Sequence, residues 1–329
     1  MTIIAIAGRL LQMPLRVPGD YNEGWNAYLA DRALGMLPLY PSLNEPISNN
    51  YPPLSFYLIG GVGHVIGDNI IAGRCISFVS LLVVMGIGGW IIKKQTDQLM
   101  PAVLSMSILM AVFTINASGY MAMNDPQLLA HAVQFMALGL LLGPQKVMIS
   151  AVLMAVSLCI KHNLIALPGA VLVWLMLNRR RAGILYFLGM TGVLILCYGL
   201  FDIFYGPNFL ESLLHAPRSY DLALGMANLR RWLKPQMAII VLGVFALWHQ
   251  NKDKTVQLLG LYGGISLFIG SALAGGAGID RNIIFDVMIA FSLLSAWTFV
   301  AIKKPRAQLL TGLLLCFFIG WFFTKRVPY

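Results

Sequence analysis

The chain has 329 residues, 58% of them hydrophobic and 11% charged, and its formal net charge is +10. Soluble domains are roughly 45–50% apolar and about 25% charged. A soluble protein of this length could not hide so much apolar surface, so the composition excludes one and predicts an all-α polytopic membrane protein. We expect residues 1–329 to form a single transmembrane domain.

About eleven membrane-spanning helices are predicted, because roughly 20 apolar residues cross a bilayer as a helix. Residues 1–15 would form the first, although they are short for a span and contain Arg9. The later spans are predicted at 71–92, 100–115, 126–143, 147–160, 164–178, 183–204, 236–249, 255–277, 282–302 and 306–324. Since the chain stops soon after the last of these, no C-terminal soluble domain is expected.

Two longer connections separate these spans. Residues 16–70 are expected to be the first extracytoplasmic loop, with juxtamembrane helices inside it, and residues 205–235 the second large outer loop. The apolar stretch 52–67 could be another span, but counting it as one would place the later basic clusters outside. We therefore predict a juxtamembrane or re-entrant helix there.

The distribution of charge predicts which side of the membrane each loop faces. If residues 16–70 lie outside, the short inner loops hold eleven basic and two acidic residues, and the outer side holds eleven of each. Short, densely basic loops belong in the cytoplasm. The basicity therefore reflects topology, and we do not expect nucleic acid as a partner. We predict an integral protein of a bacterial inner (plasma) membrane, with its functional loops outside.

The first outer loop is rich in acidic and aromatic residues, and a helix is predicted to begin in it at Asp20. At about 100° per residue, Asp20, Glu23 and Asp31 fall within one arc of about 80°. The opposite side carries Tyr21, Trp25, Tyr28, Leu29, Arg32 and Met36. This pattern predicts an amphipathic helix on the membrane surface, with its acids toward an aqueous cleft.

A purely structural alternative accounts for part of this pattern. Asp-x-x-Glu at a helix start is a capping box, so Asp20 and Glu23 could simply satisfy backbone N–H groups. Capping does not account for Asp31 on the same face, or for the downstream run Asn49-Asn50-Tyr51-Pro52-Pro53. We therefore expect this loop to take part in binding or catalysis.

The motifs of residues 20–130 resemble those of the GT-C superfamily of integral-membrane glycosyltransferases. The similarity is to the branch of lipid A aminoarabinose transferases and protein O-mannosyltransferases. It is carried by the early acids Asp20 and Glu23, by Gly35-Met36-Leu37-Pro38-Leu39-Tyr40, by Tyr51-Pro52-Pro53-Leu54, by Gly73-Arg74 and by Asn124-Asp125-Pro126. The resemblance implies eleven or more helices, an active site at the outer membrane face and a polyprenyl-phosphate-linked sugar as donor.

The chemistry implied by this resemblance is glycosyl transfer to a lipid, glycan or protein acceptor. Such a transfer needs a base for the acceptor proton and a group that stabilises the departing phosphate. Asp20 is the candidate base, with Glu23 or Asp125 as its partner, since two carboxylates held close would raise the pKa of one of them. No cofactor is required, although an acid pair of this kind can hold a divalent cation. No histidine or cysteine shows metal-ligand spacing.

Several other residues are candidates for binding the substrate. Aminoarabinose transferases carry a lysine before the Pro-Pro element, whereas this chain has Asn50-Tyr51, so the phosphate contact is expected elsewhere. A lysine between two spans could serve equally as an ordinary solvated residue, and arginines in an outer loop could equally contact lipid headgroups. The candidates are Asp31, Tyr51, Arg74, Lys161, Arg218, Arg230, Arg231 and Arg281.

A transporter or lipid flippase is the alternative function. Many helices and short loops would suit such a protein, and transporters often contain duplicated halves and polar residues near the middle of the membrane. The sequence contains no evident internal repeat, and its acids cluster in loops rather than within spans. These two features favour the glycosyltransferase, whose expected partners are the lipid-linked donor, the acceptor and membrane lipids.

Overall fold

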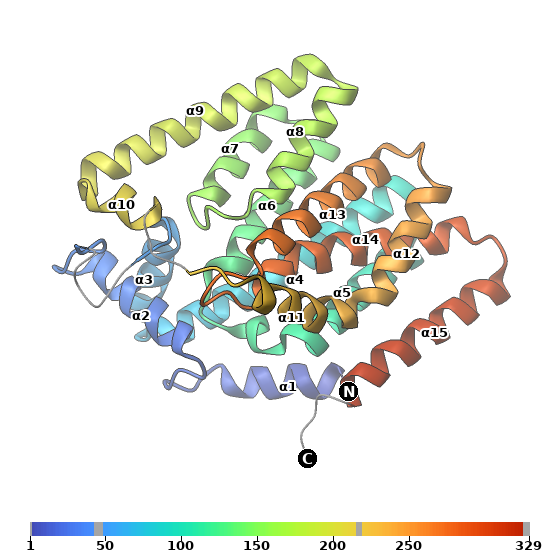
Figure 1. Ribbon diagram of the computed structural model, residues 1–329, viewed down its shortest axis with the longest axis horizontal. Helices are drawn as coiled ribbons and strands as arrows, with labels where there is room; N and C mark the ends of the chain where they lie inside the picture. Colours follow the sequence, from blue (N-terminus) through green and yellow to red (C-terminus); the bar gives the residue numbers. More distant parts are fainter. Residues whose placement is uncertain (1, 43–48, 215–218, 325–329) are drawn as a thin grey trace.

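Helices make up almost the whole of the computed structural model, which describes residues 2–42, 49–214 and 219–324 (Figure 1). Within these ranges there is no β-strand, and extended pairing is confined to an isolated bridge between Tyr220 and Gly276. The predicted all-α fold class is therefore confirmed.

The helices follow one another with short connections. The α-helices are α1 (Thr2–Gln12), α2 (Tyr21–Leu34), α3 (Leu54–Ile66), α4 (Asn69–Thr96), α5 (Leu99–Ala117), α6 (Pro126–Leu142), α7 (Val147–Leu158), α8 (Ala166–Asn178), α9 (Arg180–Tyr205), α10 (Asn208–Leu214), α11 (Leu222–Leu233), α12 (Met237–His249), α13 (Lys254–Leu273), α14 (Phe285–Ala301) and α15 (Pro305–Thr324). Three short 3-10 helices are η1 (Ser118–Ala122), η2 (Lys234–Gln236) and η3 (Arg281–Ile284).

Each of the ten spans predicted after residue 70 coincides with one of these helices, α4 to α9 and α12 to α15. In the described part of the chain, six helices are long and apolar enough to cross a membrane, and five shorter apolar helices accompany them. The chain is thus a polytopic membrane protein. The span expected at residues 1–15 is represented by α1, which has 11 residues and is about 17 Å long, well short of a hydrocarbon core of about 30 Å.

The centre of the bundle is α14, which α4, α5, α12 and α13 surround. Fifteen of its seventeen residues are buried, because its sequence is apolar on every side and a helix of that kind needs neighbours all round. Two of its hydroxyls donate to backbone carbonyls: Ser295 to Ser292 and Thr298 to Leu242. By contrast, α9 lies at the periphery and exposes large apolar side chains such as Ile195 and Phe204, as a lipid-facing helix does.

Aromatic packing joins two distant segments where α2, α3 and α10 lie together in Figure 1. The buried Tyr40 ring lies edge-on to Tyr205 at 4.8 Å and to Phe209 at 5.0 Å. The Tyr40 hydroxyl donates to the carbonyl of Tyr51 at 2.8 Å, and Tyr205 bonds to Tyr57 at 2.7 Å. These contacts hold the segment after α2 against the end of α9 and fix the position of Tyr51.

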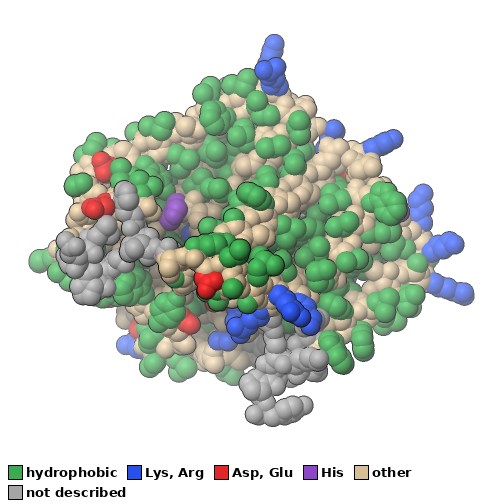
Figure 2. Space-filling view, viewed as in Figure 1, with side chains coloured by type: hydrophobic (Ala, Val, Ile, Leu, Met, Phe, Trp, Pro, Cys, Tyr) green, Lys and Arg blue, Asp and Glu red, His purple; other side chains and the backbone are tan. Residues whose placement is uncertain are grey.

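Basic and acidic side chains gather at different ends of the helices. In Figure 2, most of the projecting Lys and Arg side chains lie where the α8–α9, α12–α13 and α14–α15 connections are, and most of the acids lie on the side of α2, α10 and α11. This separation is the charge asymmetry on which the predicted orientation rests.

Gly73 lies where α4 meets the segment that precedes α6. A Cβ atom at this position would collide with the Asn124 side chain, which is itself bonded to the backbone of Glu23 and Asn69. Gly86 lies in the same helix but faces open space. Only the first glycine is therefore needed for close packing.

Gly73→Ala is expected to lower the free energy of unfolding by about 1–3 kcal/mol, because Asn124 must move and loses hydrogen bonds. Gly86→Ala is the matched control and should be neutral or stabilising by up to about 1 kcal/mol, since alanine is the better helix former. Denaturant titration of the two purified variants measures both effects. Equal stabilities would show that the contact at Gly73 is unimportant.

Candidate active site

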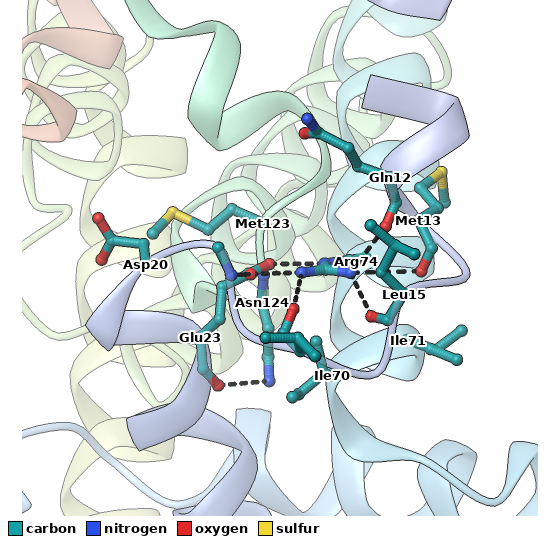
Figure 3. Close-up of polar contacts among 12 residues, drawn as sticks. Gln12, Met13, Leu15, Asp20, Glu23, Ile70, Ile71, Arg74, Met123 and Asn124 are labelled. Carbon is teal, nitrogen blue, oxygen red and sulfur yellow. Dashed lines mark hydrogen bonds and ion pairs between the residues drawn. The ribbon is translucent and has the colours of Figure 1, made fainter. Parts of the chain in front are cut away.

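A buried ion pair between Arg74 and Glu23 forms the structural centre of the end of the bundle where α2 lies (Figure 3). Arg74 lies in the second turn of α4, and Glu23 in the first turn of α2. The guanidinium donates from Nε to Oε1 at 2.8 Å and from Nη2 to Oε2 at 2.6 Å. Both side chains are 5% exposed or less. This two-pronged geometry is the strongest form of such a pair.

The remaining guanidinium N–H groups hold the segment between α1 and α2. Arg74 Nη1 donates to the carbonyls of Gln12 at 2.8 Å and Leu15 at 2.6 Å. Nη2 donates to the carbonyl of Val17 at 2.9 Å. One side chain therefore joins α4, α2 and the linker that leads into α2, as Figure 3 shows.

Glu23 is engaged just as completely as its partner. Its Oε2 also accepts from the Gly19 N–H at 2.7 Å, and its Oε1 from the Asn124 N–H at 3.2 Å. Burial raises the pKa of Glu23, but the bonds from Arg74, Gly19 and Asn124 outweigh it and hold that pKa below its ordinary value. The structure thus pairs Glu23 with Arg74 and not with Asp20, and the polar atoms of both side chains are engaged by partners within the protein.

Asp20 caps α2 and remains accessible. Its Oδ1 accepts from the Asn22 N–H at 2.9 Å, so the capping interpretation is confirmed as far as this bond goes. In Figure 3 the Asp20 carboxylate points away from the Arg74 pair. The side chain is exposed and lines a polar cavity of about 320 Å³, which we call the Asp20 cavity. This cavity is lined by Arg9, Gln12, Gly19, Asp20, Glu23, Arg74, Ala117, Ser118, Gly119, Tyr120, Ala122, Met123, Asp280 and Arg281.

Lys161 is a buried cation in the connection between α7 and α8. Its ammonium lies 3.3 Å from Asp125 Oδ1 and 4.9 Å from the centre of the Tyr51 ring, and its side chain is 2% exposed. Burial lowers the pKa of Lys161, but Asp125 and Tyr51 raise it further, so the pKa is held above its ordinary value and the group stays charged. Lys161 is therefore not a solvated loop residue.

Short helices place Lys161 deep in the bundle. With 12 residues α7 is about 18 Å long, whereas α9 beside it has 26 residues and is about 39 Å long. Figure 1 shows α9 continuing well beyond the turn that joins α7 to α8. The lysine thus lies at the floor of a recess.

A second polar cavity, of about 330 Å³, opens above this floor, and we call it the Lys161 cavity. Its lining residues are Tyr21, Asn22, Asn50, Tyr51, Tyr120, Lys161, His162, Asn163, Leu213, Ser219, Tyr220, Ala272, Leu273, Gly276, Gly278, Ile279, Asp280, Asn282 and Ile283. The two polar cavities are adjacent, because Tyr120 and Asp280 line both of them. Asp125 is outside both linings and lies behind Lys161 as its counter-ion and as the cap of α6.

The structure brings only part of the predicted set to these cavities. Arg281 lines the Asp20 cavity, where its Nη1 donates to the Asn116 carbonyl at 2.8 Å. Asp31 lies elsewhere: it accepts from Asn69 at 2.6 Å beside a separate groove. Arg230 and Arg231 are exposed on α11, outside both linings. Arg218 lies outside the described residues.

Two residues of the shared wall had no sequence signal of their own. Tyr120 follows an apolar span and reads as part of it. Asp280 precedes Arg281, and only Arg281 is among the residues that the sequence predicts for substrate binding. The three acids predicted to face one cleft are divided: Asp20 and Glu23 line the Asp20 cavity, where Glu23 is only 3% exposed, and Asp31 lies beside a separate groove.

Other hollows offer less chemistry. One of them, of about 1110 Å³, is an apolar groove between α5 and α15 with no acidic or basic residue in its lining. Among the described residues there is no cluster of three or more His, Cys, Asp and Glu side chains that could hold a metal ion. A divalent cation thus stays a prediction carried by the acids of the Asp20 cavity.

Two solved structures share the fold of this chain. ArnT from Cupriavidus metallidurans, a GT-C aminoarabinose transferase, has the same fold in its apo-state crystal structure, with a TM-score of 0.69, 14% sequence identity and 94% of this chain covered. A second crystal structure of ArnT from this organism, bound to undecaprenyl phosphate, has a TM-score of 0.68 and 15% sequence identity, with 95% of this chain covered. The expected GT-C-like fold is therefore confirmed.

The likeness is one of structure and covers only part of ArnT. This chain spans 61% of the ArnT chain in the first structure and 63% in the second. No protein-family model matches the sequence, and no curated protein matches it either.

Glu23→Gln is expected to lower the free energy of unfolding by about 3–5 kcal/mol at neutral pH, because it leaves the buried Arg74 without a counter-charge. The Glu23 pKa is depressed in the fold, so its contribution is fully present above the ordinary pKa of about 4.3 and is lost as pH falls through the lower folded value. Unfolding measured at pH 7, 5 and 3 should therefore show a steeper acid loss in the wild type than in the variant.

Glu211→Gln supplies the control, because Glu211 is exposed on α10 and its neutralisation should change stability by no more than about 0.5 kcal/mol. A Glu23→Gln variant as stable as Glu211→Gln would contradict the importance assigned to the pair.

Proposed function

We propose that this protein transfers a sugar from a polyprenyl-phosphate donor to an acceptor hydroxyl or amine. The observation that carries the proposal is the arrangement of an accessible carboxylate, Asp20, and a buried cation, Lys161, in two cavities with a common wall. An inverting displacement at a sugar needs its base and its leaving group on opposite faces of the ring. The fold shared with ArnT, of which one structure holds undecaprenyl phosphate, supports the same reading.

In this mechanism the acceptor enters the Asp20 cavity and its proton passes to the Asp20 carboxylate. The freed electron pair of the acceptor oxygen or nitrogen forms a bond to the anomeric carbon of the sugar. The bond from that carbon to the phosphate oxygen breaks, and its electron pair stays on the phosphate. The ammonium of Lys161 stabilises the charge that develops there, which is worth more in a dry recess than in water.

The charge asymmetry supports an orientation with both cavities on the outer side of a bacterial inner membrane. The cavities lie at the end of the bundle that carries most of the acids, away from the densely basic connections. The donor is then reached from the outer leaflet. A lipid, a glycan or a protein remains the proposed acceptor.

Asp20→Asn tests the base. Asparagine caps helices as well as aspartate does, so the variant should keep its stability within about 0.5 kcal/mol while transfer falls by a factor of roughly 10²–10⁴. Asp221→Asn is the matched control, because Asp221 also caps a helix, α11, but lines neither cavity. Transfer of radiolabelled sugar from a panel of undecaprenyl-phosphate sugars into a crude acceptor pool measures the rate. If Asp20→Asn transfers as fast as Asp221→Asn, the assignment of the base is wrong.

Lys161 is tested through binding of sugar-free undecaprenyl phosphate. Asp125→Asn should still bind it, because asparagine caps α6 and the negative phosphate supplies the counter-charge that Asp125 gives Lys161 in the wild type. Asp125→Asn combined with Lys161→Met removes both buried charges without leaving one unpaired, and should weaken binding by roughly 10- to 100-fold. Equal affinities in the two variants would exclude Lys161 from the phosphate site.

If neither the wild type nor any variant transfers label from any donor, the proposed transfer reaction is wrong, and a flippase assay on the same lipids is the next measurement.

A further inference from the structure

The wall between the two polar cavities consists of a tyrosine and a carboxylate from distant parts of the chain. The Tyr120 hydroxyl donates to Asp280 Oδ2 at 2.9 Å, across 160 residues of sequence. Both residues line the Asp20 cavity and the Lys161 cavity. Any ligand that reaches from one cavity into the other must therefore pass this pair.

Asp280 is held in place on both sides along the chain. The next residue, Arg281, donates from Nη1 to the Asn116 carbonyl at 2.8 Å, and the Asn282 carbonyl accepts from Gln127 Nε2 at 3.1 Å. On the other side, the Ala277 N–H donates to the Ser219 carbonyl at 2.9 Å. The carboxylate is thus presented by a fixed turn, which is the condition for a precise binding contact.

The Asp280 carboxylate has hydrogen-bonding capacity left for a ligand. An ionised carboxylate offers about four acceptor positions. Tyr120 occupies one, and the Arg281 Nε atom lies 3.5 Å from Oδ1, beyond a good hydrogen bond. The side chain is 45% exposed. Groups that donate hydrogen bonds, such as sugar hydroxyls or an ammonium, are the natural complement of these free oxygens.

Charge at this wall also favours a donor ligand over an anion. The carboxylates of Asp20, Asp125 and Asp280 all act electrostatically on the Tyr120 hydroxyl. Arg281, whose Nε atom lies 3.5 Å from Asp280 Oδ1, offsets part of this negative charge. A phosphate beside the free acceptor positions of Asp280 would still be repelled by that carboxylate, whereas the neutral hydroxyls of a sugar ring would not. The phosphate therefore belongs at Lys161, and the group between the phosphate and Asp20 belongs at the wall.

We infer that Asp280 binds the sugar during transfer, accepting hydrogen bonds from its hydroxyl or amino groups, and that the Tyr120–Asp280 bond separates the donor-phosphate side from the acceptor side. This inference rests on the proposed function, because the sugar must lie between Lys161 and Asp20. Asp280 is in this scheme a specificity-determining residue and takes no part in proton transfer.

The test compares the binding of two lipids that differ only by the sugar. Dissociation constants of the purified protein in nanodiscs are measured for undecaprenyl phosphate and for undecaprenyl-phosphate-linked aminoarabinose, glucose and mannose in turn. In the wild type, at least one sugar-linked lipid should bind more tightly than undecaprenyl phosphate. Asp280→Asn should raise the dissociation constant of that sugar-linked lipid by about tenfold or more, because the charged contact to the sugar is lost. The dissociation constant of undecaprenyl phosphate should stay unchanged within about twofold.

Two further variants separate a sugar contact from a structural effect. Tyr120→Phe keeps the carboxylate and should weaken the sugar-linked lipid by a smaller factor than Asp280→Asn does. Asp221→Asn neutralises an acid next to the same turn without entering a cavity and should leave both affinities unchanged.

The outcomes distinguish this inference from the function on which it rests. If the wild type binds no sugar-linked lipid more tightly than undecaprenyl phosphate, the proposed donor is wrong and the inference falls with it. Suppose instead that the wild type prefers a sugar-linked lipid over undecaprenyl phosphate. If Asp280→Asn shows the same preference, or loses affinity for both lipids equally, only the role of Asp280 is overturned.

Discussion

The contact between Arg74 and Glu23 is the interaction on which the arrangement of the candidate site depends. A guanidinium and a carboxylate buried this deeply lose most of their hydration, which is costly unless every donor and acceptor finds a partner. Here the partners are backbone groups of the linker before α2 and of the segment before α6. Desolvation thus forces three separate stretches of chain to converge on one point. The position of Asp20, three residues before Glu23, follows from that convergence.

In the second buried pair, Lys161 with Asp125, the cation has fewer hydrogen-bond partners than Arg74 has. Arg74 directs its N–H groups to five protein oxygens at short range, whereas the Lys161 ammonium lies 3.3 Å from one carboxylate oxygen and otherwise contacts the Tyr51 side chain. An ammonium can donate three hydrogen bonds. The first pair is therefore complete and structural, while the second retains the capacity to bind an anion. The two ion pairs differ in this capacity because backbone carbonyls accept hydrogen bonds from Arg74.

The helices could be predicted from sequence because an apolar segment in lipid must satisfy its backbone hydrogen bonds internally and therefore forms a helix, and the ten predicted spans coincide with helices for that reason. The helix beginning after Asp20 followed from its cap and periodicity. The side-chain pairing did not, since Glu23 and Arg74 are 51 residues apart and either could have bound a ligand instead. Arg230 and Arg231 show the opposite case. Their charge predicted a phosphate contact, but α11 leaves both side chains exposed and outside the two cavities. The orientation of α11 cannot be predicted from a local sequence pattern. Asp280 depends on contacts with Tyr120 and on the fixing of its turn, which are tertiary properties.

The unequal lengths of neighbouring helices have a consequence for the surrounding lipid. At about 18 and 20 Å, α7 and α8 are shorter than a hydrocarbon core of about 30 Å, while α9 next to them exceeds it. Local thinning of the leaflet beside the short hairpin is one way of relieving such a hydrophobic mismatch, at a modest cost for each ångström. Under the proposed function, a leaflet that thins there would bring the phosphate of the lipid-linked donor closer to the depth of Lys161. The thickness of the bilayer would then help to determine how easily a lipid phosphate reaches Lys161.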